Sequence, residues 1–413
     1  MKKFTSKYFN ELLVFTKQPT AEMTETYEHK TDIVLAKDGT ESRTALRSKP
    51  RATYDFKFSE DSNEAQGLYN VFHDKLRDKY AVPVWTQSLK LKENTPEYST
   101  ELIFEGKDAL YVDWALIDLD GMIYGMAILY ESEYNFEVVE VGFRPEWDDL
   151  NEYTVVALDI GTKTKKSWPS GTVVMPLRPC YISDKVMQSR SGLTNAYTLT
   201  FQVLNNAVLD EDTPETVEDI DVYLTQYLSS ENAVRAIDFD SEIDSFDPLL
   251  GRFYKRTTWL NNRVGSSMRV VTTNLKEYYD ARKRFQRHRG KFRPFWYPSF
   301  EDNLKIIEVN NDKIEAIDDG MSDKYKYLYV MRVSTGEPSS FAIISVVRKP
   351  DGTMTITLDR TVDIDVNDIQ YVSYITYCRM DTDNLSLSWV GNGVSVSNWR
   401  IVELEPSTKK LLT

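Results

Sequence analysis

The chain has 413 residues, 50 of them Lys or Arg and 64 Asp or Glu, which gives a formal net charge of −14. This length predicts about two to four domains, and the hydrophobic fraction of 41% is enough for buried cores. The acidic balance argues against a general nucleic-acid-binding protein, although a local basic patch is still compatible with it.

The cysteine content and the apolar runs exclude two further classes of protein. Cys180 and Cys378 lie far apart without a C-x-x-C motif, so we expect neither a disulfide framework nor a cysteine-rich metal site. No apolar run approaches the roughly 20 residues of a membrane-spanning helix, and residues 1–10 lack the apolar stretch of a secretory signal. We therefore expect no membrane-spanning segment and synthesis in a cytoplasm.

The N-terminal part combines short strands with one helix. Residues 33–35 and 54–58 have strand patterns, and Asp38-Gly39 is typical of a hairpin turn. A helix is predicted over about residues 62–78, with Ser62 as its N-cap. Pro83 and Trp85 follow this helix.

Only strands are predicted between residues 88 and 205. Turns rich in Gly, Asp and Asn separate them at the close spacing of β-sandwiches and barrels. The clearest lie at 89–91, 102–104, 110–112, 122–124, 136–138, 154–158, 172–178 and 197–203, with a turn at 168–171.

An acidic run from Asp210 to Asp221 marks the strongest change in composition. It predicts a linker over residues 209–247. Such runs are usually solvated; the functional interpretation is that Asp210, Glu211 and Asp212 contact the basic cluster of a neighbouring subunit.

A second helix begins at Leu275, because Tyr278, Ala281 and Phe285 fall on one helical face. Gly290 is expected to end it in a left-handed C-cap. A cationic cluster covers its end, and the candidate interface residues are Arg282, Arg284, Arg287, Arg289 and Arg293. Acidic protein surface, including the chain's own acidic run, is the favoured partner; phosphates of a nucleic acid are the alternative.

The two helices stand in similar surroundings, which predicts a tandem duplication. Pro294 and Trp296 follow the second helix as Pro83 and Trp85 follow the first, both at a separation of 211 residues (294 − 83 and 296 − 85). Chance similarity is the alternative, since identity outside these positions is low. Alternating strands fill residues 327–403, so the predicted fold class is mainly β.

Residues with catalytic or metal-binding chemistry form no recognisable motif. The three histidines, His29, His73 and His288, share no metal-ligand spacing, and a surface or capping role is expected for the last two. No phosphate-binding glycine motif is present. Asp113 and Asp118 are the most suggestive carboxylates, although a turn is the simpler interpretation. We therefore expect no catalytic, cofactor-binding or metal-binding residues and no cofactor.

Four segments resemble a family of tailed-bacteriophage tail proteins related to distal-tail and baseplate-hub components. They are residues 168–178, residues 197–201, residues 289–300 with Phe295-Trp296-Tyr297-Pro298-Ser299-Phe300, and residues 372–389. The resemblance covers about residues 150–405, and the N-terminal part is similar more loosely. Its structural signature comprises Pro83, Trp85, Gly290, Pro294, Trp296, Pro298 and Trp389.

This resemblance implies tandem tail-tube-like β-sandwich domains, each with a flanking helix, plus additional β domains. The expected division is a first tube-like domain at 1–95, a β-rich domain at 96–208, the linker at 209–247, a second tube-like repeat at 248–310 and a C-terminal β domain at 311–413.

The function implied by the resemblance is structural. We expect a ring at the tail tip or baseplate of the virion, joining the tail tube to the host-recognition apparatus. Because two tube-like copies lie in one chain, three chains match a six-fold tube, so a homotrimer is expected, with a homohexamer as the alternative. Expected partners are the tail tube, tape-measure, hub and fibre proteins, with nucleic acid at most passing through the lumen. The competing function is a tail-associated cell-wall hydrolase using Asp113 and Asp118.

Overall fold

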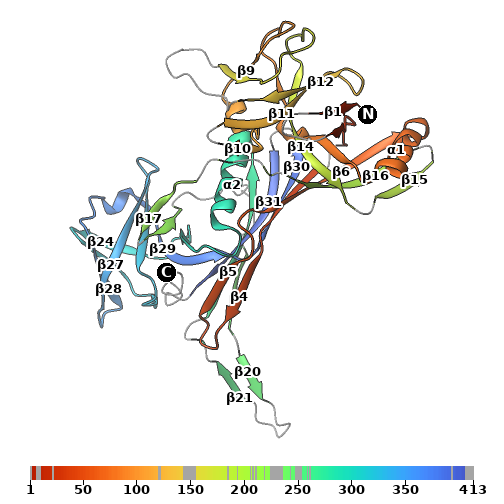
Figure 1. Cartoon of the computed structure of the whole chain (residues 1–413). Helices are drawn as coiled ribbons and strands as arrows, with labels where there is room; N and C mark the ends of the chain where they lie inside the picture. Colours follow the sequence, from red (N-terminus) through yellow and green to blue (C-terminus); the bar gives the residue numbers. More distant parts are fainter. Residues whose placement is uncertain are drawn as a thin grey trace.

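The computed structural model describes residues 2–5, 11–20, 23–119, 122–142, 155–183, 186–192, 194–204, 206, 209, 212–217, 219–223, 236–241, 243–246, 254–257, 259, 262–391 and 394–404. Over these residues the chain is mainly β, as predicted, with strands throughout and two α-helices (Figure 1). Most strands belong to one continuous hydrogen-bonded network.

The first half of the chain runs from β1 to β16. Its elements are β1 (Lys3–Phe4), β2 (Leu12–Val14), β3 (Met23–Glu28), β4 (Thr31–Leu35), β5 (Glu41–Ala45), β6 (Arg51–Asp61), α1 (Ser62–Lys75), β7 (Lys79–Pro83), the 3-10 helix η1 (Trp85–Gln87), β8 (Leu89–Lys90), β9 (Glu101–Glu105), the 3-10 helix η2 (Asp108–Tyr111), β10 (Ile117–Leu119), β11 (Met122–Tyr130), β12 (Phe136–Val141), β13 (Val155–Asp159), β14 (Val173–Ile182), β15 (Met187–Ser191) and β16 (Thr194–Val203).

The second half runs from β17 to β31. Its elements are β17 (Glu215–Val217), β18 (Ile220–Val222), β19 (Ala236–Asp240), β20 (Ile243–Phe246), β21 (Tyr254–Thr257), β22 (Arg263–Thr272), α2 (Leu275–His288), β23 (Phe295–Pro298), β24 (Ile306–Asn310), β25 (Lys313–Ile317), β26 (Tyr327–Arg332), β27 (Pro338–Arg348), β28 (Thr353–Leu358), the 3-10 helix η3 (Val366–Asp368), β29 (Ile369–Met380), β30 (Asn384–Gly391) and β31 (Val394–Glu403).

The strand pairings of the first half recur in the second. β2 pairs in parallel with β7, and β18 in parallel with β23. β3 and β16 flank β6, as β19 and β31 flank β22. β14 joins β7 to β16, as β29 joins β23 to β31. Each half also contains an insertion, which includes β11 and β12 in the first half and β26 and β27 in the second. These insertions correspond, since β11 lies between β14 and β12 as β26 lies between β29 and β27.

A single row of antiparallel strands joins the two halves. Its order is β15-β16-β6-β3-β30-β31-β22-β19, in which β3 of the first half pairs with β30 of the second. The pairing sets Thr24 opposite Ser388 and Tyr27 opposite Leu385. The junction between the halves is therefore a continuous backbone hydrogen-bond ladder.

Local sequence explains the main elements. Tyr54, Phe56 and Phe58 alternate along β6 and are all buried in one core, because successive side chains of a strand point to opposite faces. Helix α2 begins after Asn274, whose side chain accepts a hydrogen bond from the backbone N–H of Glu277 at 2.9 Å. Asparagine is a favoured N-cap residue, so the local sequence explains why α2 begins at this point.

The two helices have different environments. α2 lies in the middle of the molecule beside the insertion of the first half, whereas α1 lies at its edge (Figure 1). The β4–β5 and β20–β21 hairpins project from the same side of the view. Gly39, in the turn of the β4–β5 hairpin, accepts a hydrogen bond through its carbonyl from Arg263 at the start of β22.

Several sequence-based predictions need correction. Residues 110–112 were expected to be a strand, but η2 occupies 108–111 because Ala109 is buried and its carbonyl accepts the indole N–H of Trp114 at 2.8 Å. α1 ends at Lys75 rather than about residue 78. α2 ends at His288, with Arg289 (φ 50°) as the left-handed cap, and Gly290 (φ 64°) continues the turn.

The match of Pro83 and Trp85 to Pro294 and Trp296 does not agree with the strand register. Pro83 pairs with Leu177 three residues before Cys180 on β14, and Pro298 pairs with Ile375 three residues before Cys378 on β29. Pro83 therefore corresponds to Pro298, because the connection that follows α2 is longer. The two cysteines themselves occupy corresponding positions, and both are buried.

The predicted linker at 209–247 includes four strands, β17 to β20, among the residues that the structure describes. β18 pairs with β23, so part of this segment is packed against the second half. Asp210 and Glu211 lie outside the described residues. The five-part domain division stays a prediction.

Candidate functional site

A buried ionic cluster lies where α2 of the second half meets the first half. Its centre is Asp113, which follows η2, and its side chain is 1% exposed. Arg282 of α2 binds both carboxylate oxygens of Asp113, with Nη1 2.6 Å from Oδ2. Arg178 of β14 approaches the same carboxylate at 3.1 Å and also donates to the Asp113 carbonyl at 2.8 Å. Arg282 thus binds Asp113 in the bidentate geometry that makes arginine–carboxylate pairs strong, and Arg178 adds a second positive charge beside the same carboxylate.

Polar side chains from β3 and η1 complete the cluster. Glu25 accepts hydrogen bonds from Thr86 at 2.6 Å and from the hydroxyl of Tyr278 at 2.5 Å. Arg282 donates to the Tyr27 hydroxyl at 2.8 Å, and its guanidinium lies 4.4 Å from the ring centre of Tyr278. The cluster therefore ties α2 to β3, the same strand that carries the backbone ladder between the halves.

The two carboxylates have opposite pKa shifts. Burial disfavours the charged form of Asp113, but Arg282 and then Arg178 outweigh it and lower its pKa to about 2. Burial raises the pKa of Glu25 above its ordinary value, and Arg282, Thr86 and Tyr278 offset this only in part. Asp113 is therefore the fixed negative charge that balances Arg282.

The geometry around Asp113 suits a structural role of this carboxylate better than acid–base catalysis. Both carboxylate oxygens are engaged by arginines, and Gln87 donates a further hydrogen bond at 2.9 Å. A general acid or base must reach a substrate proton, which the enclosure of Asp113 prevents. The side chain of Asp118 in β10, the second carboxylate of the predicted hydrolase, lies outside the described part of the structure.

A second buried cluster also joins the halves. Glu41 of β5 binds Arg379 of β29 at 2.8 Å and 2.9 Å, and Arg263 of β22 at 2.7 Å. The Arg379 guanidinium favours the ionised form of the Glu41 carboxyl, so the pKa of Glu41 lies below its ordinary value although the group is buried. Sequence reasoning missed this cluster and Glu25, because its members come from segments hundreds of residues apart and share no local motif.

The cationic residues of α2 bind inside the chain. Arg282 is buried against Asp113, and Arg287 forms an ion pair with Asp221 of the acidic run at 2.8 Å. Arg284 lies 4.1 Å from the ring centre of Tyr223, whose hydroxyl donates to Asp212 at 3.1 Å. Within one chain the acidic run thus contacts the basic cluster through Asp221 and Arg287, and the expected contact between neighbouring subunits stays a prediction.

Other predicted residues have structural contacts. Arg289 is the helix cap, and the backbone N–H of Arg293 donates to the His288 carbonyl at 2.9 Å. His288 was expected at the surface, but it is fully buried between Phe295 and Tyr223, and burial lowers its pKa to about 3. His288 lies on the buried face of α2, and burial disfavours the charged imidazole, which therefore stays neutral.

The aromatic signature residues pack in the interior. Trp296 lies against Tyr327 and Tyr377, and Trp389 of β30 packs edge-on against Tyr278 at 4.8 Å. Trp85 of η1 contacts Tyr130 in the same manner. Pro294 is half-buried and precedes β23. These residues stabilise the junctions between strands and helices.

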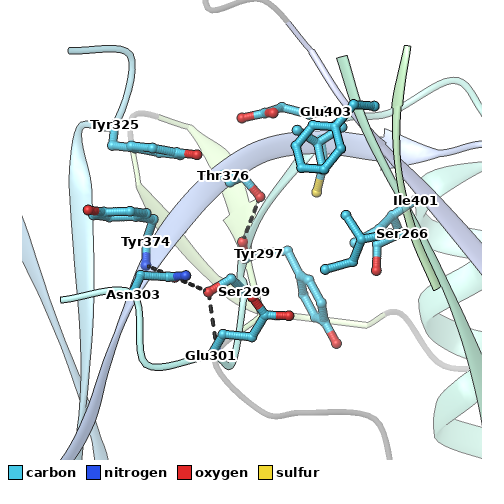
Figure 2. Close-up of a pocket in the computed structure, with 14 residues that line it drawn as sticks. Ser266, Tyr297, Ser299, Glu301, Asn303, Tyr325, Tyr374, Thr376, Ile401 and Glu403 are labelled. Atoms are coloured by element: carbon cyan, nitrogen blue, oxygen red, sulfur yellow. Dashed lines mark hydrogen bonds between the residues drawn. The ribbon is translucent and has the colours of Figure 1, made fainter. Parts of the chain in front are cut away.

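A cavity of about 190 Å³ lies on the second half, beside β19, β22 and β31 (Figure 2). Its polar side chains bond to neighbouring chain atoms. Thr376 donates to the Tyr297 carbonyl at 3.0 Å, and Asn303 accepts from the backbone N–H of Tyr374 at 3.0 Å. The 14 lining residues contain no histidine, lysine or arginine, so this cavity offers no charged donor for an anionic ligand.

Within the described residues no group of three or more His, Cys, Asp or Glu side chains is placed to hold a metal ion. None of the described helices combines the length and apolar character needed to cross a membrane. A scan against models of known protein families found no match, and a search of curated proteins found none.

Proposed function

We propose that this protein is a structural component of a bacteriophage tail tip or baseplate, where it forms the ring that joins the tail tube to the distal host-recognition apparatus. The observation that carries the proposal is the repeated pattern of strand pairing, with one half of the chain joined to the other through β3 and β30. A protein whose two halves already pair side by side is suited to continue that pairing around a ring.

In this proposal each half is a β-sandwich with a flanking helix. In the first half one layer is β15-β16-β6-β3 and the other is β2-β7-β14, with β14 bonded to β16 at one edge. The helix follows directly after β6 in the first half and two residues after β22 in the second. This recurrence supports the tandem tail-tube-like domains that the resemblance implies.

The buried charges support a rigid junction rather than catalysis. Asp113 and Glu41 each bind two arginines, and Arg282, Arg263 and Arg379 reach them from the other half. Replacing one partner of such a pair leaves an uncompensated buried charge, which costs about 3–5 kcal/mol. The relative orientation of the halves is thereby fixed, as a ring of defined size requires.

The proposed number of chains in the ring follows from the two similar halves of each chain. If each half occupies one position of a six-fold tube, three chains complete it, and we propose a homotrimer in the virion tail tip. Three rows of eight strands give a barrel of about 24 strands, wide enough to enclose a lumen. Neighbouring tail proteins would be its partners.

Native mass spectrometry of the purified chain tests the proposal. We expect three copies; six copies would favour the homohexamer of a distal-tail ring. Images of the same sample should show closed rings with a central hole. A stable monomer at high concentration, together with a clear zone on a peptidoglycan zymogram, would replace the ring with the cell-wall hydrolase.

A further inference from the structure

We propose that the edge strand β19 of one protomer pairs with the edge strand β15 of a second copy of this chain, and that helix α1 of the second copy covers the cavity beside β19. The inference deepens the proposed ring and rests on it. It follows from the junction inside the chain, where β3 pairs with β30 and α2 covers β3.

The open edges lie at the two ends of the strand row. Among the described residues β15 pairs with β16 alone, and β19 pairs with β22 alone. β15 corresponds to β30, and β19 corresponds to β3, the two strands that form the internal junction. An exposed edge is a template for pairing with another chain, and here the matching edge is supplied by the same sequence.

The hairpins at the ends of β16 and β31 fix the correspondence residue by residue. Ser191 pairs with Thr194, and Gly391 pairs with Val394, so two residues of the sequence separate the paired positions in each case. β16 therefore corresponds to β31 from its first residue onward. Phe201 then corresponds to Ile401, and their partners Tyr54 and Ser266 correspond to each other.

The register between protomers follows from these equivalences. Opposite Tyr54 lies Glu25, and opposite Ser266 lies Ile237, so Thr24 corresponds to Ala236. Opposite Ala196 lies Ser189, and opposite Val396 lies Ser388, so these serines correspond. Because Thr24 pairs with Ser388, Ala236 of one protomer is expected opposite Ser189 of the next.

The exposed apolar side chains on β19 support this partner. Ile237 is 41% exposed and Phe239 is 74% exposed, and both line the cavity of Figure 2. Their counterparts on β3, Glu25 and Tyr27, are buried beneath α2. The second half therefore leaves uncovered the surface that the first half covers with a helix.

Helix α1 offers the matching side chain. α1 and α2 both contain 14 residues, and Tyr69 and Arg282 are the eighth residue of each. Arg282 contacts Tyr27, so Tyr69 is expected to contact Phe239, the counterpart of Tyr27. Tyr69 is 54% exposed in the single chain. Two exposed aromatic rings would thus replace the buried charged contact with a packed one.

Disulfide cross-linking between copies tests the register. The variant Ala236→Cys with Ser189→Cys should form covalent oligomers under mild oxidation, because paired strand residues have Cα atoms about 4.5–5.5 Å apart and a disulfide spans about 4.4–6.8 Å. A bond within one chain is not possible, since six strands separate β15 from β19. Cys180 and Cys378 are buried and should not interfere.

The matched control is Ala236→Cys with Gln188→Cys. Residue 188 is adjacent to 189 but faces the opposite side of the strand, so we expect at least fivefold less covalent oligomer on a non-reducing gel. Equal cross-linking of the two variants, or none with either, rejects the interface. Closed trimers by native mass together with either of those results would retain the ring and assign it to another surface.

A second variant tests the helix contact independently of cysteines. Phe239→Asp should raise the dissociation constant between protomers at least tenfold, because it places a charge opposite Tyr69. The control Val390→Asp changes a side chain that is also exposed, at 68%, but lies on β30, next to Trp389 at the end of the ladder with β3. Unchanged association of Phe239→Asp contradicts the contact with α1.

Discussion

The replacement Arg282→Met is the most direct test of the buried cluster between the halves. Methionine keeps most of the side-chain volume but removes the guanidinium, whose exposure is 1%. Asp113 then keeps Arg178 and Gln87 and loses its bidentate partner, while Tyr27 loses a donor. Removing one partner of a buried pair costs about 3–5 kcal/mol, and we expect a loss at the lower end because Arg178 remains.

Equilibrium urea unfolding followed by tryptophan fluorescence measures this loss, with Lys276→Met as the control. Lys276 lies on the same helix, but its side chain is 59% exposed in an ion pair with Asp280, so its replacement should cost less than about 1 kcal/mol. Adding Asp113→Asn to Arg282→Met should cost less than the sum of the single changes, because the two residues interact directly. If Arg282→Met and Lys276→Met have the same midpoint, the cluster does not stabilise the junction.

Two further changes have outcomes that the structure defines. Gly290→Ala should lower the free energy of unfolding by about 2 kcal/mol or more, since φ is 64° and an added Cβ would lie 2.4 Å from Oδ1 of Asp383. The control Gly171→Ala is also at positive φ but has nothing within 4 Å, so it should cost only about 1 kcal/mol. Equal shifts of the melting temperature for the two variants would contradict the steric argument. His288 has a folded-state pKa of about 3, below the value of 6.5 for a free imidazole, so only the unfolded chain gains its proton as pH falls from about 6.5 towards 3. Stability should therefore fall by about 1.4 kcal/mol for each pH unit in that window; His288→Phe should remove this contribution, and an unchanged slope in urea unfolding between about pH 6.5 and 4.5 would refute it.

Alternating side chains and helical spacing were enough to predict most local structure. Tyr54, Phe56 and Phe58 gave β6, and the spacing of Tyr278, Ala281 and Phe285 gave α2, because each pattern depends only on the period of its own element. The hairpin at Asp38-Gly39 follows from glycine at positive φ. The strand predicted at residues 110–112 was wrong, because three consecutive apolar residues are as compatible with a buried 3-10 turn as with a strand.

The predicted duplication shows where sequence spacing misleads. A common separation of 211 residues aligned Pro83 with Pro294, whereas the hydrogen-bond register aligns it with Pro298. The connection after the helix differs in length between the halves, whereas the pairing of β7 with β14 matches that of β23 with β29. Strand partners are therefore better markers of equivalence than the distance along the chain.

The sequence by itself determined the mainly β class and the two helices, and it favoured acidic side chains as partners of the basic cluster. Only the tertiary structure decided which acidic residues those are. Arg282 binds Asp113 and Arg287 binds Asp221, and Glu41 meets Arg263 and Arg379 from the other half. The physical reason is that ion pairs act over a few ångströms in space, and chain folding brings together residues whose separation in sequence carries no signal of their contact.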